Sequence, residues 1–426
     1  MGLPLKGDME MYRKAATGMY MNYFLLGMVN VMLISNMGSL TEQWNTDSAG
    51  ISFIIAAIGI GKLFTYAIAG RLSDRFGRKP LILFSGLVMG IFLFCVPLAP
   101  SYQIAFLLAL FAGVANSAMD AGSYPGLIEA FPKSAGSASV MVKAFMAAGT
   151  ALLPFMILFF AQQDMFYGFA FFVPATLYVL TMLFLIRVSF PNHRILPSSE
   201  SRQDSEVEKV FISEPKFSKE GLALVVIGFT STGLFTVAQI WLPSYGEEVL
   251  GLSTASSIKL LSYYSIGSLL SVLTLAVFLK KFIRPVTVIV IYPIITFLAI
   301  VTILTIKIPS VAIVAAFFIG LSTAGIFQLA IAIMAELFWK KKGSVTGIVA
   351  TAAGLASVVM PLATGLLSKT GNISIIFIFD AFLAVTGFLA AAFVYYRYGK
   401  VIGKNKGKPA SDKKTATSAK SNLLED

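Results

Sequence analysis

Three ionisable side chains interrupt otherwise apolar stretches of the chain: Lys62, Asp120 and Lys143. A charged group deep in an apolar segment costs free energy, so such residues are candidates for function. A carboxyl group that moves between wet and apolar surroundings binds and releases a proton, and a nearby ammonium group holds it in the charged form. We expect Asp120 to be a proton-coupling residue, with Lys62 and Lys143 as charges of the same cavity. A permanent ion pair between Asp120 and one of these lysines is the alternative.

A second set of side chains is uncharged but able to bind a polar molecule. Amides, hydroxyls and indole N–H groups form hydrogen bonds, and aromatic rings stack on flat or ring-shaped molecules. Each is equally compatible with packing between helices, and Trp241 is also compatible with an aromatic belt at a membrane surface. The candidate binding residues are Asn30, Asn36, Tyr124, Gln239, Trp241 and Gln328.

Catalytic and metal-binding patterns are missing from the sequence. It contains no Walker loop, and His193, the only histidine, lies in a polar segment without a metal-binding partner nearby. We therefore expect no enzyme activity, no ATP-driven pumping, no bound metal and no cofactor.

The composition indicates that a lipid bilayer surrounds these residues. Of 426 residues 57% are hydrophobic and only 13% charged, and the mean hydropathy is +0.81. A spanning helix needs about twenty apolar residues. We predict an all-α integral membrane protein with twelve transmembrane helices near residues 15–40, 48–69, 81–98, 102–128, 138–162, 166–188, 221–245, 255–279, 286–306, 310–337, 344–367 and 372–396.

The basic residues predict the orientation of the chain. The net charge is +12, yet 28 of the 33 Lys and Arg fall in the segments that lie on one side of the bilayer if the N-terminus is cytoplasmic. Such a bias places both termini in the cytoplasm. We expect a multi-pass protein of the cell (cytoplasmic) membrane, whose partners are the lipid bilayer, a small molecule and protons rather than nucleic acid, and which acts as a monomer.

One long polar segment divides the spans into two groups of six. The domains we predict are a cytoplasmic N-terminus (1–14), a six-helix bundle (15–188), a cytoplasmic linker (189–220), a second six-helix bundle (221–396) and a Lys-rich cytoplasmic tail (397–426). The tail either stays solvated or binds anionic lipid headgroups.

An internal repeat supports two pseudo-symmetric bundles. A shift of about 207 residues aligns identical residues at the ends of corresponding spans, which is typical of duplicated halves. The aligned pairs are Gly113 with Gly320, Glu129 with Glu336, Phe131 with Phe338, Lys133 with Lys340, Gly136 with Gly343, Ser137 with Ser344 and Pro154 with Pro361.

A motif between the second and third spans points to a family. Residues 70–80 read GRLSDRFGRKP. This segment resembles the signature loop of the major facilitator superfamily, and every defining position of that loop is filled. The resemblance implies two parallel six-helix bundles with a solute site between them near mid-membrane.

The loop also has a physical interpretation of its own. Gly70 permits close helix approach and Gly77 a tight turn. Asp74 is able to face a helix N-terminus or to pair with Arg75 or Arg78. The resemblance implies that Asp74 holds the outward-open state against the second half.

The basic residues of the loop have two interpretations. Glu129, at the end of the fourth span, is a candidate partner of Arg75 or Arg78, and together these groups would form a cytoplasmic gate motif. In the alternative, the basic residues only fix the orientation of the chain.

A weaker resemblance concerns the transported solute. Residues 119–125, MDAGSYP, place a carboxylate five residues before a proline on the fourth span. This is similar to the fucose permease branch, whose acid takes part in proton-coupled sugar uptake. Asp120 stands where that branch has Glu and Tyr124 where it has Asn, and the first span offers no second acid.

Transport of a small solute is the function that these patterns favour. We expect alternating access and proton-coupled symport of a sugar or small organic acid, because Lys62 and Lys143 suit an anionic or hydroxyl-rich solute. A proton-coupled antiporter that exports a drug or metabolite is the alternative. A membrane sensor without transport is a more remote one, since the linker and tail are too short for a signalling domain.

Overall fold

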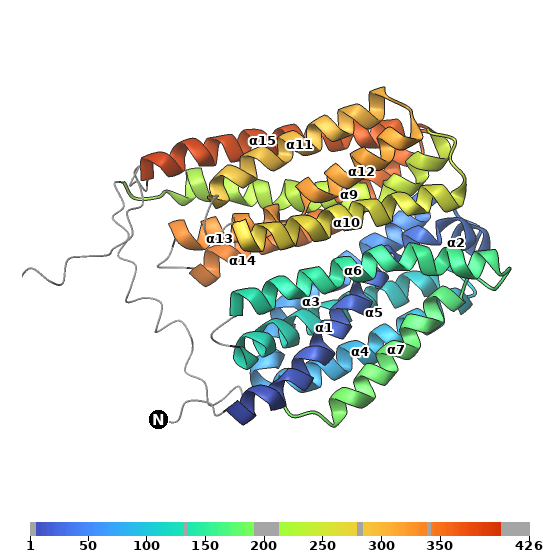
Figure 1. The fold of residues 1–426 in the computed structure, drawn as a ribbon, viewed down its shortest axis with the longest axis horizontal. Helices are drawn as coiled ribbons and strands as arrows, with labels where there is room; N and C mark the ends of the chain where they lie inside the picture. Colours follow the sequence, from blue (N-terminus) through green and yellow to red (C-terminus); the bar gives the residue numbers. More distant parts are fainter. Residues whose placement is uncertain (1–5, 132–134, 191–212, 279–283, 339–341, 402–426) are drawn as a thin grey trace, which may run out of the picture.

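The computed structural model describes residues 6–131, 135–190, 213–278, 284–338 and 342–401, and in these ranges the chain consists of helices joined by short turns and loops (Figure 1). Its first half comprises α1 (Lys6–Ser35), α2 (Met37–Trp44), α3 (Ser48–Phe76), α4 (Arg78–Cys95), η1 (Val96–Leu98), α5 (Tyr102–Ala130), α6 (Ala135–Gln162) and α7 (Phe169–Ile186). The second comprises η3 (Phe217–Gly221), α9 (Leu222–Glu248), α10 (Thr254–Phe278), α11 (Pro285–Thr305), α12 (Pro309–Thr323), α13 (Ile326–Leu337), α14 (Lys342–Ser368) and α15 (Ser374–Val401).

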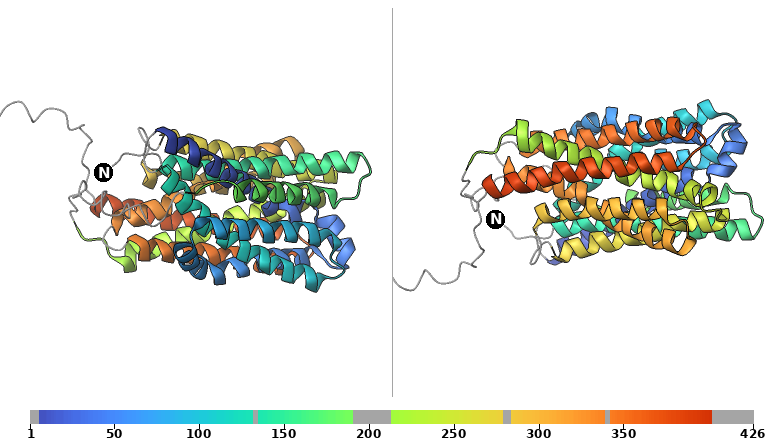
Figure 2. Two further views of the ribbon diagram at one scale, coloured as in Figure 1. Left: turned by 90° about the horizontal axis from the view of Figure 1, so that it is seen from below. Right: turned by 90° about the horizontal axis from the view of Figure 1, so that it is seen from above.

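The helices form two bundles that lie side by side with nearly parallel axes. Figure 1 shows α1 to α7 in blue to green below α9 to α15 in yellow-green to red, and Figure 2 shows the same layout from two other sides. Helix α1 begins and α15 ends at the same end of the molecule. We call this the terminus end and the opposite end the far end.

Twelve segments of the described chain are long and apolar enough to cross a bilayer, so the predicted all-α membrane fold with twelve spans is confirmed. The boundaries differ in places. Helix α3 continues to Phe76, beyond the predicted span 48–69, and α15 continues to Val401, into the predicted tail. Residues 191–212 of the predicted linker and 402–426 of the predicted tail lie outside the described residues.

Two predicted spans are interrupted. In the predicted span 15–40, helix α1 ends at Ser35 and a short helix, α2, starts after Asn36, so the prediction of a single helix over these residues is wrong. The predicted span 310–337 is broken between Thr323 and Ile326, where Gly325 has φ 91°. A left-handed glycine cannot continue a right-handed helix without a break. The prolines at 125, 154, 243 and 361 lie inside continuous helices, so the spans do not break there.

Glycine pairs bring helices together within each half. Gly61 of α3 and Gly113 of α5 face each other: a Cβ on Gly113 would collide with the carbonyl oxygen of Ile58. The absent side chains let the backbones touch, which is how helices pack inside membranes. In the second half Gly267 of α10 and Gly320 of α12 make the same kind of crossing. Gly113 and Gly320 correspond in the repeat, so the two halves share this packing.

The two halves meet mainly at the far end and in the middle of the spans. Helix α3 packs on α14 and α6 on α10. Ser262 of α10 donates a hydrogen bond to the carbonyl oxygen of Ala151 in α6 at 3.1 Å. On α3, Gly59 lies against Ser357, and Leu63 lies against Gly354.

Nearer the terminus end, the same faces of α3 and α14 part. Gly70 lies two turns beyond Leu63 on the face that packs against α14, yet a Cβ there would have no atom of the described residues within 4 Å. Gly347, two turns beyond Gly354 on α14, is equally free. Tyr66 is exposed on α3. The molecule is therefore open between these helices at the terminus end.

The glycine crossing gives a first prediction. Gly113→Ala should destabilise the fold by about 1–3 kcal/mol, because the added methyl group meets backbone atoms that cannot move without displacing a helix. The thermal unfolding midpoint of the purified protein in detergent measures this. Gly399→Ala, in α15 with no atom near its Cβ position, is the matched control and should leave the midpoint unchanged or raise it. Equal midpoints for both variants would contradict the close crossing.

Candidate functional site

The central ion pair joins α3 to α5 inside the first half. The Nζ atom of Lys62 lies 2.8 Å from Oδ2 of Asp120. The side chain of Asp120 is only 8% exposed, and that of Lys62 33%. The crossing at Gly61 and Gly113 brings the two helices close enough for this contact, and the long side chain of Lys62 spans the six residues, about 9 Å along the helix axis, by which Asp120 lies farther from the crossing.

Two tyrosines complete the surroundings of the carboxylate. The hydroxyl of Tyr23, from α1, donates to Oδ1 of Asp120 at 2.8 Å, and the hydroxyl of Tyr66, from α3, donates to Oδ2 at 3.5 Å. Hydrogen bonds from several donors favour the ionised form of a carboxyl group. Asp120 thus contacts two hydroxyl groups in addition to the ammonium group of Lys62.

Lys62 has a second acceptor one turn before Asp120. Its ammonium group donates to Oδ1 of Asn116 at 3.2 Å. Asn116 and Asp120 are four residues apart and share one face of α5. The ammonium group thus lies between a carboxylate and an amide oxygen, and it keeps an acceptor if the carboxylate is neutralised.

Lys143, on α6, belongs to the same electrostatic cluster. It interacts with both Asp120 and Lys62 at longer range, and among the described residues it forms no ion pair within contact distance. The crossing of α6 with α1 at Gly149 and Gly27 holds it there. The structure thus brings all three of the charges singled out in the sequence to one place, with Lys62 rather than Lys143 in contact with Asp120.

A cavity of about 480 Å³ connects this cluster with the terminus end. Asp120, Tyr124 and Pro125 of α5 line one side and Tyr66, Gly70 and Asp74 of α3 the other, with Arg78 at its rim. Asp120 therefore lies at the inner end of a cavity whose outer part is formed by the motif loop.

The motif loop is organised around Arg78. Its guanidinium group contacts Oδ1 of Asp74 at 2.7 Å and Oε1 of Glu129 at 2.9 Å, and it donates to the hydroxyl of Ser73 at 2.7 Å. Glu129 thus pairs with Arg78 and not with Arg75, whose guanidinium group stacks on the ring of Phe76 at 5.4 Å.

The remaining motif residues set the shape of the loop. Gly77 joins α3 to α4 with φ 94°, a conformation that favours glycine. Gly70 makes no close helix contact on the side of its Cβ position in this conformation, since no atom of the described residues lies within 4 Å of that position. The side chain of Asp74 remains 75% exposed although it pairs with Arg78.

The binding candidates of the first half lie at different distances from the cluster. Tyr124 lines the cavity, and its ring lies 5.6 Å from that of Tyr23. Asn30 is half-buried on α1. Asn36 is buried at the break after α1 and donates to the carbonyl oxygen of Met32 at 2.8 Å, which is a local structural contact.

The candidates of the second half are not joined to Asp120 by any hydrogen bond within the described ranges. Gln239 is buried on α9. Trp241 is fully buried and its Nε1 has no hydrogen-bond partner in the described structure, so it does not belong to a lipid-facing belt. Gln328 is exposed on α13.

Several residues of the site were missed in the sequence. Asn116 could have been found from its spacing of four from Asp120. Tyr23 and Tyr66 could not, because tyrosines are common in such spans and only the helix crossings select these two. Asp380 carried the same signal as Asp120, since it interrupts the apolar run of the last span.

Asp380 lies in the second half, on α15. Its side chain is fully buried, and neither carboxyl oxygen has a hydrogen-bond partner in the described part of the chain. It interacts electrostatically with Tyr264 of α10, whose hydroxyl contacts Thr323 at the break between α12 and α13. An isolated carboxylate would cost far too much free energy in such surroundings, so we predict that this group carries its proton.

Fold and site together define the class: a multi-pass membrane protein with a charged cluster at the inner end of a cavity. Residues 19–320 and 260–424 match the family model of the Major Facilitator Superfamily. The chain belongs to this superfamily and is a transporter across a membrane. The family resemblance of the motif loop is thereby confirmed.

Relatives and solved structures agree with this family. The chain is 59% identical over 390 residues to the "uncharacterized MFS-type transporter YfkL" of Bacillus subtilis (strain 168), covering 92% of this chain and 98% of the relative. It is 36% identical over 383 residues to the inner membrane transport protein YdiN of Escherichia coli (strain K12), covering 90% of each.

Among solved structures, a D-xylose–proton symporter superposes with a TM-score of 0.72 at 15% identity, over 90% of this chain and 97% of the other. The nucleoside transporter NupG superposes with a TM-score of 0.72 at 12% identity, over 90% and 99%. At these identities the likeness shows the fold alone.

The state of Asp380 can be tested. Asp380→Asn replaces a neutral carboxyl group by a neutral amide of the same shape, so the unfolding midpoint in detergent should change little, by less than the shift from Gly113→Ala. Asp120→Asn, which removes the charge that pairs with Lys62, should lower the midpoint clearly. A large loss of stability in Asp380→Asn would indicate instead that the native group is ionised and paired.

Proposed function

We propose that the protein is a proton-coupled symporter that imports a small polar solute, a sugar or small organic acid, by alternating access. The observation that carries this proposal is the pair of Lys62 and Asp120 at the inner end of the cavity, where a carboxyl group and an ammonium group contact each other. Proton binding at one group then changes what the other is able to bind.

The coupling step follows from the two acceptors of Lys62. While Asp120 is ionised, its carboxylate neutralises the ammonium group and competes with any solute for it. When Asp120 takes a proton, Lys62 keeps its contact with Asn116 and becomes available to a carboxylate or hydroxyl group of a solute. Proton and solute therefore bind together, which is the requirement for symport rather than antiport.

The direction of transport follows from the proposed orientation of the chain in the membrane. Because 28 of the 33 Lys and Arg fall in the segments that the sequence assigns to the side of the termini, we infer that the terminus end is cytoplasmic. The cavity at Asp120 then opens inward, and the unprotonated carboxylate corresponds to the state after the proton has left. Uptake of the next proton takes place with the far end open.

Closure of the terminus end is assigned to α3 and α14. Gly70 and Gly347 lie on facing sides of the opening and carry no side chains, so these helices are able to approach there as they do at Gly59. In that closed state the exposed Asp74 would contact the second half, as the motif implies. Arg78, tied to Glu129, keeps the loop in position for this contact.

The solute would lie between the halves, next to Lys62 and Tyr124. Asn30 from the first half and Gln239, Trp241 and Gln328 from the second are its further candidate contacts once the halves move. The proton symporter and the nucleoside transporter of the same fold carry hydroxyl-rich solutes by their names. Lys62 and Lys143 extend the choice to organic acids.

The test begins with the solute. Sugars, nucleosides, small organic acids and lipophilic cations are screened for a rise in the unfolding midpoint of the purified protein, because a ligand of the folded state stabilises it. The best ligand is then used for uptake into proteoliposomes with an imposed pH gradient. An acidic exterior should accelerate uptake. Acceleration of efflux by an inward proton gradient would contradict symport and indicate the antiporter.

Asp120→Asn should separate binding from coupling. The amide imitates the protonated acid, so solute binding should persist and lose its pH dependence, while uptake driven by a pH gradient should fall at least ten-fold. Asp164→Asn, an exposed aspartate at the far end, is the matched control and should leave uptake unchanged. If Asp120→Asn transported normally and kept its pH dependence, Asp120 would only be part of a permanent ion pair.

Gly70→Leu should block closure of the terminus end. The side chain fits into the open space of this conformation, so the unfolding midpoint should stay the same, but it would prevent α3 and α14 from meeting and uptake should fall at least ten-fold. Gly399→Leu, at the same end and equally unobstructed but on α15, is the control. Normal uptake by Gly70→Leu would exclude closure at this point.

A further inference from the structure

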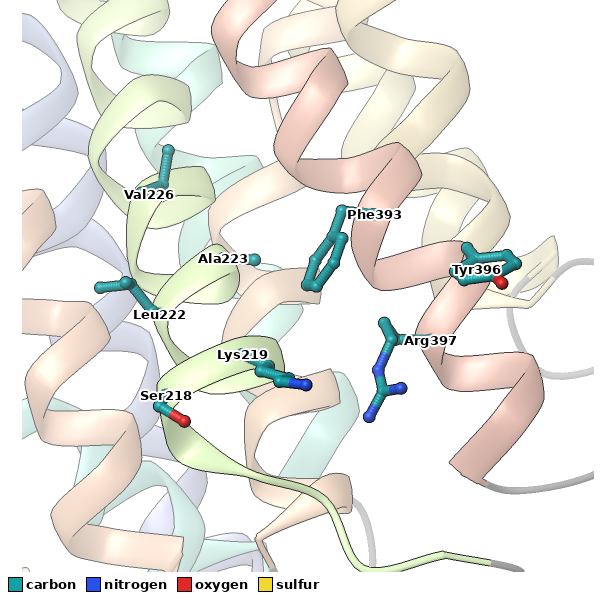
Figure 3. A pocket seen from close by; sticks show the side chains of 8 residues that line it. All are labelled: Ser218, Lys219, Leu222, Ala223, Val226, Phe393, Tyr396 and Arg397. Carbon is teal, nitrogen blue, oxygen red and sulfur yellow. The ribbon is translucent and has the colours of Figure 1, made fainter.

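A second cavity lies at the terminus end of the other half, between the start of α9 and the end of α15 (Figure 3). Its volume is about 550 Å³. Lys219, Leu222 and Val226 line one side, and Phe393, Tyr396 and Arg397 line the other. We call this cavity the α9–α15 groove. It shares no residue with the cavity at Asp120.

The groove opens toward the lipid and not toward the space between the halves. Phe393 and Tyr396 belong to a stripe of exposed apolar residues that recurs every three to four positions along α15, and such a stripe on a spanning helix faces lipid chains. Leu222 on the α9 side is also more than half exposed. Figure 2 shows α15 and the start of α9 on the outer surface of the bundle. The stripe comprises Ile378, Phe382, Val385, Leu389, Phe393 and Tyr396.

The terminus end of the groove is positively charged. Figure 3 shows the side chains of Lys219 and Arg397 extending into the space between the two helices. Lys219 is exposed and has no ion pair among the described residues. The ammonium group of Lys400 lies 4.4 Å from the ring centre of Tyr396. Lysines and tyrosines at the end of a spanning helix lie at the level of the lipid headgroups.

One buried carboxylate holds Arg397 in place. Its Nε donates to Oε1 of Glu220 at 2.6 Å, and Glu220, which is fully buried, also accepts the backbone N–H of Lys216 at 2.9 Å. Within the described residues this is the ion pair that Arg397 forms, so its two terminal guanidinium nitrogens have N–H groups to offer an anion. Lys219, Arg397 and Lys400 together outnumber Glu220, so the groove has a surplus of positive charge.

We propose that the α9–α15 groove binds an anionic phospholipid. The phosphate lies between Lys219 and Arg397, where a guanidinium group with free N–H donors suits phosphate oxygens. Ser218 at the rim offers a hydroxyl donor. The acyl chains lie along Leu222, Val226 and Phe393. Lys219 and Val226 are seven residues apart, about 10 Å along the helix, which matches the distance from headgroup to upper acyl chain.

The bound lipid has a structural consequence. It bridges the first turn of α9 and the last turns of α15, the two ends of the second half in the sequence, and it does so beside the Glu220–Arg397 pair. Because it binds the folded state, it stabilises the second half by a free energy that rises with the logarithm of its concentration above the dissociation constant. This proposal concerns the lipid surroundings and is independent of the transported solute.

The test uses the full-length protein in a mild detergent. Phosphatidylglycerol and phosphatidylcholine with the same acyl chains are titrated in separate experiments, and the unfolding midpoint and the number of retained lipids by native mass spectrometry are measured. Phosphatidylglycerol should stabilise the protein more. Lys219→Gln should weaken its apparent affinity about five-fold, the effect of about 1 kcal/mol per basic residue at a charged lipid surface.

Two controls keep the result specific. Lys307→Gln removes the same charge from an exposed lysine at the far end and should not change the affinity. Inorganic phosphate and soluble glycerol phosphate should give no stabilisation at the concentrations of lipid that saturate the protein. Equal stabilisation by both lipids, an equal loss in Lys219→Gln and Lys307→Gln, or full stabilisation by inorganic phosphate would each overturn the proposal.

Discussion

The close crossing of α3 and α5 at Gly61 and Gly113 is the constraint on which the site depends. A lysine and an aspartate in separate spans would each be costly inside a bilayer if their charges were unpaired. The glycines bring the backbones into contact, so that the residue after Gly61 and the residue two turns after Gly113 meet at 2.8 Å. Asn116 and the two tyrosines then satisfy the remaining donors and acceptors around this pair.

The two halves share this crossing but not its chemistry. Gly267 and Gly320 repeat the backbone contact in the second half, yet the positions that carry Lys62 and Asp120 in the first have no charged counterparts there. Instead the second half contains a broken span at Gly325, a hydroxyl contact between Tyr264 and Thr323, and a buried Asp380 without a hydrogen-bond partner in the described residues. Duplication thus preserved the helix packing, which depends on glycine, while the charged groups stayed on one side of the proposed solute site.

Most of the fold could be predicted from the sequence because a helix that crosses a bilayer must be apolar and about twenty residues long. Apolar runs located twelve spans, and the motif at residues 70–80 identified the family before any packing was known. The prediction failed at Asn36 and at Gly325, where a helix ends within an apolar run and hydropathy does not change. The sequence also pointed to Glu129 as a partner of the motif loop, but it left open whether Arg75 or Arg78 forms the ion pair. Both arginines lie in the same loop, and only the direction of α4 brings Arg78 to the carboxylate.

The sequence by itself determined the number of spans, the bias of positive charge and the presence of charged residues in the first half. These depend on composition along the chain, which a lipid environment converts directly into structure. Only the tertiary structure decided that Lys62 and not Lys143 contacts Asp120, that Tyr23 joins them, and that Asp74, Gly70 and Asp120 line one cavity. Such contacts depend on the angle and depth at which helices cross, and these are fixed by side-chain packing between distant segments, which no periodicity along one helix records.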